Sequence, residues 1–238
     1  MQKYPNPPIT EAVIEIRVAP SEGMSLSCLE QIQSLVPGYP TRKVIKQVEI
    51  AGDGVSASTN QTEIGYAFAS EEGKQSFMAG PLSFSFSRLS PYQGWRNFAE
   101  EASQIWECYR GLAKPASVTR IGLRFINRLD LPWPFEDFKE FLRTSPEVSP
   151  DMPQALSNFL MVLEIEHPDI KARMRLSQGN LPPVAENIVS ILLDIDLFRV
   201  DSPPFDSGEI WEYLELMRDR KNEMFEACIT DKTRELFR

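Results

Sequence analysis

The sequence predicts an α+β fold: one extended, curved antiparallel sheet with helices packed on one face, in a single domain of residues 1–238. Two observations lead to this prediction. Several segments alternate apolar and charged side chains with the period of two of a half-buried strand, most clearly at 118–131 (VTRIGLRFINRLDL). Two longer segments, 91–113 and 207–236, instead repeat apolar residues every three or four positions, which is typical of helices that pack on a sheet.

The segment 118–131 is expected to present one apolar face and one arginine-lined face. The apolar face would consist of Ile121, Leu123, Phe125 and Leu129, and the polar face of Arg120, Arg124, Arg128 and Asp130. Asn127 falls on the apolar side, which indicates either a bulge residue or a buried hydrogen-bonding anchor. We interpret this asparagine as structural.

The sequence before residue 118 predicts four strands and two helices. Residues 10–18 alternate as a strand, and apolar residues at helical spacing over 26–36 predict a short helix. An antiparallel meander is expected, with strands at 44–50, 63–69 and 82–89 and turns at 52–54 and 70–74. Ser90 and Pro91 suit the N-cap and first turn of the helix 91–113, whose aromatic stripe is expected to pack on the sheet.

The chain after residue 134 repeats this alternation. It predicts a short helix at 135–142, strands at 161–166, 172–176 and 190–200, a loop at 179–183 and a closing helix from Asp206. VIEIRV at 13–18 is similar to VLEIE at 162–166. A further hypothesis is therefore that residues 1–133 and 134–238 are pseudo-repeat halves.

The composition excludes several classes of function. A net charge of −9 argues against broad nucleic-acid binding and against binding to an anionic membrane surface. No run of about 20 apolar residues predicts a membrane span, and the first residues have no apolar signal core, so we expect a cytoplasmic protein. The three cysteines, at positions 28, 108 and 228, have neither disulfide nor metal spacing and are expected to be reduced and mostly buried.

The usual catalytic patterns are missing from the sequence. His167 is the one histidine, and beside Pro168 it indicates a polar turn residue, with a general base as the less favoured interpretation. Without a second histidine or paired cysteines, neither a zinc site nor a histidine-assisted nucleophile is expected. Neither GxxxxGK[ST] nor a strand-linked GxGxxG occurs. We therefore predict no catalytic residue, no metal ligand and no cofactor.

The charged faces of the strands are the remaining candidates for a binding site. They comprise Arg17, Arg120, Arg124, Arg128, Arg173 and Arg175, the carboxylates Glu15, Glu164, Glu166, Asp194 and Asp196, and also Glu11 and Asp130. Arginines four apart on a strand lie about 13 Å from each other, so neighbouring strands would have to complete a site. Two interpretations stay open: a solvated sheet face, or a salt-bridge lattice or groove for phosphate or carboxylate ligands.

Five segments together resemble one family. They are PNPPITEAVIEIRV, SPYQGWRNF, VTRIGLRFINRLDLP, LLDIDLF and NEMFEACITDKTRELF. The family is a sporadically distributed, uncharacterised prokaryotic one, and the resemblance spans nearly the whole chain. It implies a single module with an accessory, defence or toxin–antitoxin-like context, and it supplies no established activity, cofactor or catalytic residue.

A second likeness is to the triphosphate-tunnel enzymes, whose first strand reads E-x-E-x-K. Here Glu15-Ile16-Arg17 matches half of that pattern, and Glu164-Ile165-Glu166 lacks the following lysine. Under this resemblance Asp194 and Asp196 would serve a metal.

These observations give two expectations for function. The first is a binding or regulatory protein, not an enzyme, that acts on a partner protein or a small anionic ligand. The protein partner could also be a second copy of the chain in a homo-oligomer. The alternative is an enzyme or sensor that binds a phosphorylated ligand or nucleotide, with Mg²⁺, in the groove lined by Arg, Asp and Glu.

Overall fold

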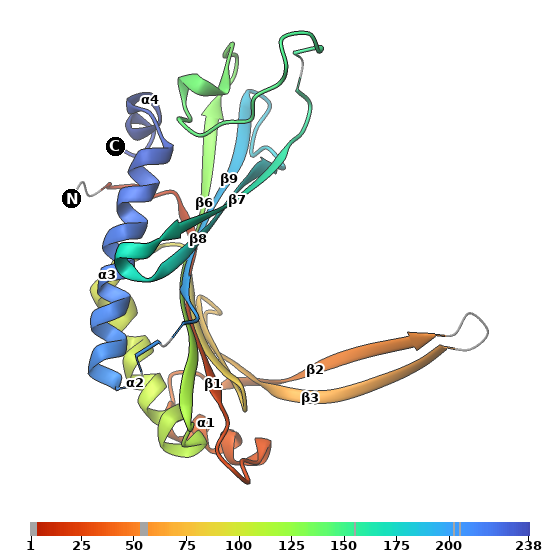
Figure 1. The fold of residues 1–238 in the computed structure, drawn as a ribbon, viewed down its shortest axis with the longest axis vertical. Helices are drawn as coiled ribbons and strands as arrows, with labels where there is room; N and C mark the ends of the chain where they lie inside the picture. Colours follow the sequence, from red (N-terminus) through yellow and green to blue (C-terminus); the bar gives the residue numbers. More distant parts are fainter. Residues whose placement is uncertain (1–3, 53–56, 155, 202, 205) are drawn as a thin grey trace.

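In the described part of the chain, nine antiparallel strands form one open, curved sheet, in the order β2-β3-β4-β5-β1-β6-β9-β8-β7 (Figure 1). The computed structural model describes residues 4–52, 57–154, 156–201, 203–204 and 206–238. The strands are β1 (Ile9–Ala19), β2 (Thr41–Gly52), β3 (Ala57–Ala69), β4 (Gln75–Gly80), β5 (Ser83–Leu89), β6 (Ser117–Pro132), β7 (Leu160–His167), β8 (Ala172–Leu181) and β9 (Ile188–Arg199). The predicted α+β fold with a curved antiparallel sheet is confirmed.

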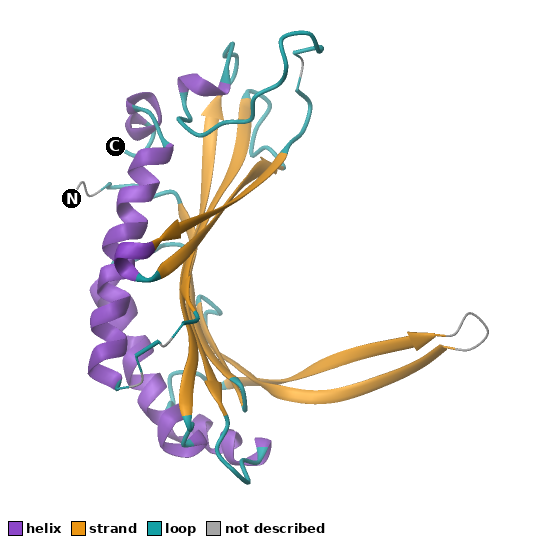
Figure 2. Ribbon diagram, in the orientation of Figure 1, coloured by secondary structure: helices purple, strands orange, loops and turns teal. Residues whose placement is uncertain are grey.

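Two long helices, α2 (Trp95–Ala113) and α3 (Ser207–Cys228), lie on one face of the sheet (Figure 2). The other face is concave and carries no helix among the described residues. Shorter elements are η1 (Leu26–Gln31), α1 (Ile32–Leu35), η2 (Phe138–Glu140), η3 (Pro168–Ile170) and α4 (Asp231–Glu235). None of the described helices is long and apolar enough to span a membrane.

The core lies between the sheet and these two helices. On β6, the odd-numbered residues from Ile121 to Leu131 are buried, as the alternation predicts. Trp106 and Tyr109 of α2 are fully buried, their ring centroids each lie 5.6 Å from that of Phe84 on β5, and the Tyr109 hydroxyl donates to the carbonyl of Gly80 at 2.9 Å. The aromatic stripe of α2 is therefore a structural surface.

Asn127 is a buried anchor in this core. Its side-chain nitrogen donates to the carbonyl oxygen of Leu193 on β9 at 2.9 Å. On its other side, the register of β1 against β6 shifts between Ile9 and Glu11. The register shift places the extra residue, Thr10, on β1, so of the two alternatives for Asn127 the structure has the buried anchor and not the bulge residue.

Several predicted boundaries are wrong. The helix predicted at 91–113 begins at Trp95, after Gly94 at φ 106, because the Ser90 N–H still bonds to Thr10 in the sheet and Ser90 cannot act as the cap. The closing helix ends at Cys228, because Ile229 is extended and bridges to Leu142. The next short helix, α4, begins after Thr230.

The remaining boundary errors concern strands and turns. Strand β4 is absent from the predicted meander, and β8 continues through most of the predicted loop at 179–183 because it stays paired with β9. The helix predicted at 135–142 is reduced to η2, and the one predicted at 26–36 divides into η1 and α1. Most of the predicted turn at 52–54 lies outside the described residues.

One sheet runs through both halves of the chain. Strand β6 pairs with β1 on one side and with β9 on the other, so the two predicted halves meet at the β6–β9 ladder. The hypothesis of a repeat stays a prediction.

Candidate functional site

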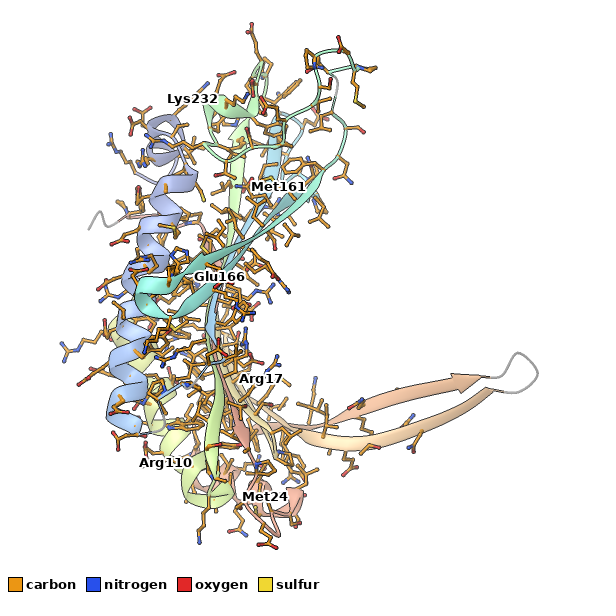
Figure 3. All side chains as sticks on the ribbon, in the orientation of Figure 1. Arg17, Met24, Arg110, Met161, Glu166 and Lys232 are labelled. Atoms are coloured by element: carbon orange, nitrogen blue, oxygen red, sulfur yellow. The ribbon has the colours of Figure 1, made fainter. Side chains whose placement is uncertain are left out.

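The concave side of the sheet gathers the predicted site residues from β1, β6, β9, β8 and β7. Figure 3 labels Arg17 on β1 and Glu166 on β7, the outer strands of this surface. We call it the charged face; it consists of Glu11, Glu15, Arg17, Arg120, Arg124, Arg128, Asp130, Glu164, Glu166, Arg173, Arg175, Asp194 and Asp196. The predicted candidates are thus placed together by the strand order.

The strand register sets opposite charges side by side. Arg124 of β6 lies opposite Asp196 of β9, and Asp196 lies opposite Arg175 of β8. Arg175 in turn lies opposite Glu164 of β7. Cross-strand neighbours are about 5 Å apart, so this row of alternating charge can form ion pairs directly.

The best-formed pair joins Arg124 to Asp194. Arg124 donates from Nε at 2.9 Å and from Nη2 at 2.6 Å to the two carboxylate oxygens. The Asp194 side chain is 8% exposed and that of Arg124 47%. This bidentate hydrogen bonding raises the pKa of Arg124. The arginine therefore covers a carboxylate that would otherwise be buried alone.

Arg120 is the most buried arginine of the charged face, with 14% of its side chain exposed. It donates to Glu15, and its Nη2 lies 3.3 Å from Oδ2 of Asp196. Its guanidinium carbon lies 4.8 Å from the centroid of the Phe198 ring. Burial lowers the pKa of Arg120 and raises that of Asp196, because desolvation outweighs the attraction between the two charges.

The other arginines of the charged face are also paired with carboxylates. Arg17 pairs with Glu15, Arg128 with Asp130, Arg173 with Glu166 and Asp201, and Arg175 with Glu164. Arg128 also donates to the hydroxyl of Ser190. The surface is therefore a salt-bridge lattice, and an added anion would have to displace a carboxylate.

A two-stranded arm extends from the edge of the sheet over its concave side (Figure 1). Strands β2 and β3 pair along their whole length, but β3 pairs with β4 only at residues 66–69. Val48 and Ile64, beyond the residues of β3 that pair with β4, are 51% and 41% exposed, and Val44, opposite Tyr66 at the base of the arm, is 43% exposed. The sequence predicts these two strands, but it contains no signal that their outer parts leave the sheet.

His167 ends β7 on the side of the sheet that packs against α3. It is buried, and its Nδ1 lies 3.0 Å from Nη1 of Arg220. Because a guanidinium only donates, Nδ1 must accept and the ring proton lies on Nε2. Burial and the Arg220 charge lower the pKa of His167. As predicted, His167 is a polar residue at the turn, directly before Pro168–Ile170.

Lys221 of α3 is a residue that the sequence reasoning missed. It is buried and lines a cavity of about 380 Å³ on the helix side of the sheet. Its position continues the apolar stripe of Leu214, Met217 and Phe225 at helical spacing. A lysine within such a stripe is the signal that could have indicated it.

No protein-family model matches the chain, and no curated protein matches it. Among the described residues, no group of three or more His, Cys, Asp and Glu side chains could hold a metal ion. Function is therefore inferred from the charged face, the arm and the cavity.

Proposed function

We propose that the chain is a binding protein, not an enzyme, and that its protein partner lies on the charged face and is held by the arm. The arm carries this proposal. An isolated two-stranded ribbon is marginally stable in water. The arm also exposes Val44, Val48 and Ile64, which nothing in the described chain covers. A partner that packs against it would supply the missing apolar contacts.

The composition of the charged face also favours a protein partner. Beside its arginines lie the half-buried Phe198 of β9 and two exposed residues of β7, Leu160 and Val162, which are 76% and 52% exposed. Arginine and aromatic residues are enriched in protein interfaces. Since its arginines are already paired, the lattice would select a partner by the arrangement of both signs of charge.

Two variants test this proposal. In the first, an Asn-Gly turn replaces residues 46–64, between the paired residues Ile45 and Gly65, which removes Val48 and Ile64 and leaves the base of the arm in the sheet. In the second, Arg175→Glu is combined with Glu164→Arg, so that an exposed ion pair is kept with its polarity reversed. The matched control is Lys139→Met, at an exposed ion pair on η2.

Light scattering of the pure chain and affinity capture from an extract of the source cells give the measurement. We expect a second copy, or another protein, to bind the wild type and the control and to bind both variants at least tenfold more weakly. A wild-type chain that is monomeric and captures nothing would contradict the proposal. So would a partner that binds the shortened arm as well as it binds the wild type.

A second candidate function is an enzyme or sensor for a phosphorylated ligand. A hollow of about 240 Å³ beside the charged face favours it, because Lys171, Arg173 and Arg199 line it together with Glu166 and Asp201. Thermal unfolding with nucleotides or polyphosphates and Mg²⁺ tests this candidate. A ligand at a hundredfold excess over its Kd should add about 2.7 kcal/mol of stability. Arg124→Ala should remove that gain if the ligand lies on the central lattice, and Arg173→Ala if it lies in the hollow.

A further inference from the structure

A cavity separate from the charged face lies on the opposite side of the sheet. The first described residues, the segment before α2, strand β6 and helix α3 surround it, and its volume is about 380 Å³. This volume is within the range of small-molecule sites. Its walls include the side chains of Tyr92, Trp95, Phe125 and Phe225 and three prolines.

Lys221 is the unusual group in this cavity. The residue is 6% exposed. Its Nζ lies 3.7 Å from the centroid of the Phe125 ring, which also lines the cavity. No described residue accepts a hydrogen bond from this ammonium or forms an ion pair with it. A ring face compensates a buried charge only in part, so the ammonium lacks a counter-ion.

The other charged groups of the cavity do not supply that counter-ion. Glu226 already accepts hydrogen bonds from Tyr4 and Arg234. Arg218 adds a second cation, paired with Glu215 and Asp219 on the surface side of α3, and its Nε is buried without a partner. Burial, and to a lesser extent the charge of Arg218, lowers the pKa of Lys221. The cavity thus has aromatic rings and prolines in part of its wall, and α3 contributes two cations and one carboxylate that is already paired.

We propose that this cavity is a binding site for a small organic anion, whose apolar body packs between the aromatic rings and whose carboxylate or sulfonate pairs with Lys221. The anion would supply the missing counter-ion, and the rings and prolines would cover its body. Asn127 lines the same cavity, and its nitrogen already donates to backbone carbonyls, so its side-chain oxygen can only accept a hydrogen bond from a donor on the body of the ligand and does not bind the anionic group. This site is independent of the proposed partner surface, which lies on the other face of the sheet.

The probe is 8-anilinonaphthalene-1-sulfonate, an aromatic sulfonate whose fluorescence rises in apolar sites. We expect saturable binding to the wild type and at least tenfold weaker binding to Lys221→Met. Lys139→Met, which removes an exposed lysine, should bind as the wild type does. Benzoate should displace the probe, whereas benzyl alcohol, which has nearly the same shape without the charge, should not.

A second measurement uses the wild type alone, so its result does not depend on whether the Lys221 variant folds. Reductive methylation with formaldehyde and a borane, read by peptide mass spectrometry, should modify Lys221 more slowly when the probe is bound and should modify Lys139 at the same rate. If Lys221→Met does not fold, Lys221→Gln takes its place. The proposal is overturned if the probe binds the lysine variant as tightly as it binds the wild type. It is also overturned if benzyl alcohol competes as well as benzoate, or if the probe leaves the methylation of Lys221 unchanged.

Discussion

The buried ammonium of Lys221 should reduce the stability of the fold, and Lys221→Met should recover the loss. Methionine has a similar length and no charge, so it can keep the packing against Phe125. Burial lowers the pKa of Lys221 from 10.5 to about 7. At about 1.36 kcal/mol per pKa unit, the charged lysine costs the folded state about 4–5 kcal/mol below pH 7. Loss of the cation–π contact subtracts about 2 kcal/mol, so we expect a gain of about 3 kcal/mol.

The gain should depend on pH with a defined sign. Between pH 7 and pH 10.5 the unfolded chain holds the lysine proton and the folded chain does not. Because the unfolded state then binds more protons, the stability of the wild type rises with pH through this window. The variant lacks this contribution. Its advantage should therefore be full below the folded pKa and should disappear as the pH approaches 10.5.

Urea unfolding at about pH 6 and about pH 10 measures this difference. Lys139→Met is the control, because its lysine is exposed and should show no such change. The difference between the unfolding free energies of the variant and the wild type cancels the contributions of groups that both chains share, among them Cys108 and Cys228. If the variant is more stable by the same amount at both pH values, or is less stable than the wild type at pH 6, the buried charge of Lys221 does not destabilise the fold.

Three further predictions concern the core and His167. Trp106→Ala should cost about 3–5 kcal/mol in urea unfolding, and a loss below about 1 kcal/mol would show that α2 is not a core element. Glu101→Leu leaves the buried Arg88 guanidinium without its ion pair and the buried Tyr39 hydroxyl without its acceptor, and should cost about 3–5 kcal/mol. The added change Arg88→Met should restore the part due to the unpaired guanidinium, and no recovery in the double variant would contradict this. Since the pKa of His167 is lowered, the wild type should lose stability as the pH falls below about 6.5, and His167→Gln should flatten that dependence; equal slopes would disprove it.

The alternation of side chains allowed the faces of the strands to be predicted, but not the pairs formed on them. A residue on a strand points to one side or the other whatever its neighbours are, so Arg124 could be assigned to the polar face from the sequence. Its partner depends on the register and on the rotamer. Asp196 lies opposite Arg124, yet the bidentate bond is made to Asp194, on the diagonal. The local sequence specifies neither the register of the strands nor the rotamer of the arginine.

The predicted boundaries of helices and strands were wrong where a tertiary contact outweighed the local preference of the residues for one secondary structure. Ser90 has the composition of an N-cap, but its N–H is bonded to Thr10 in the sheet, so the helix begins four residues after Pro91. Strand β4 (QSFMAG) has weak apolar alternation of its own and forms because β3 and β5 flank it. The arm illustrates the same limit, since a hairpin that leaves the sheet has the same turn and strand residues as one that stays in it.

The two proposed sites can be occupied at once, because they use opposite faces of one strand. Arg124 and Phe125 are consecutive on β6, and their side chains therefore point to opposite sides of the sheet. Arg124 holds Asp194 on the charged face, while Phe125 contacts the Lys221 ammonium beneath it. A small anion beside Lys221 would thus leave the lattice exposed to a protein partner. Lys221→Met should remove binding of the anion without weakening that partner, and the reversed Arg175–Glu164 pair should do the opposite.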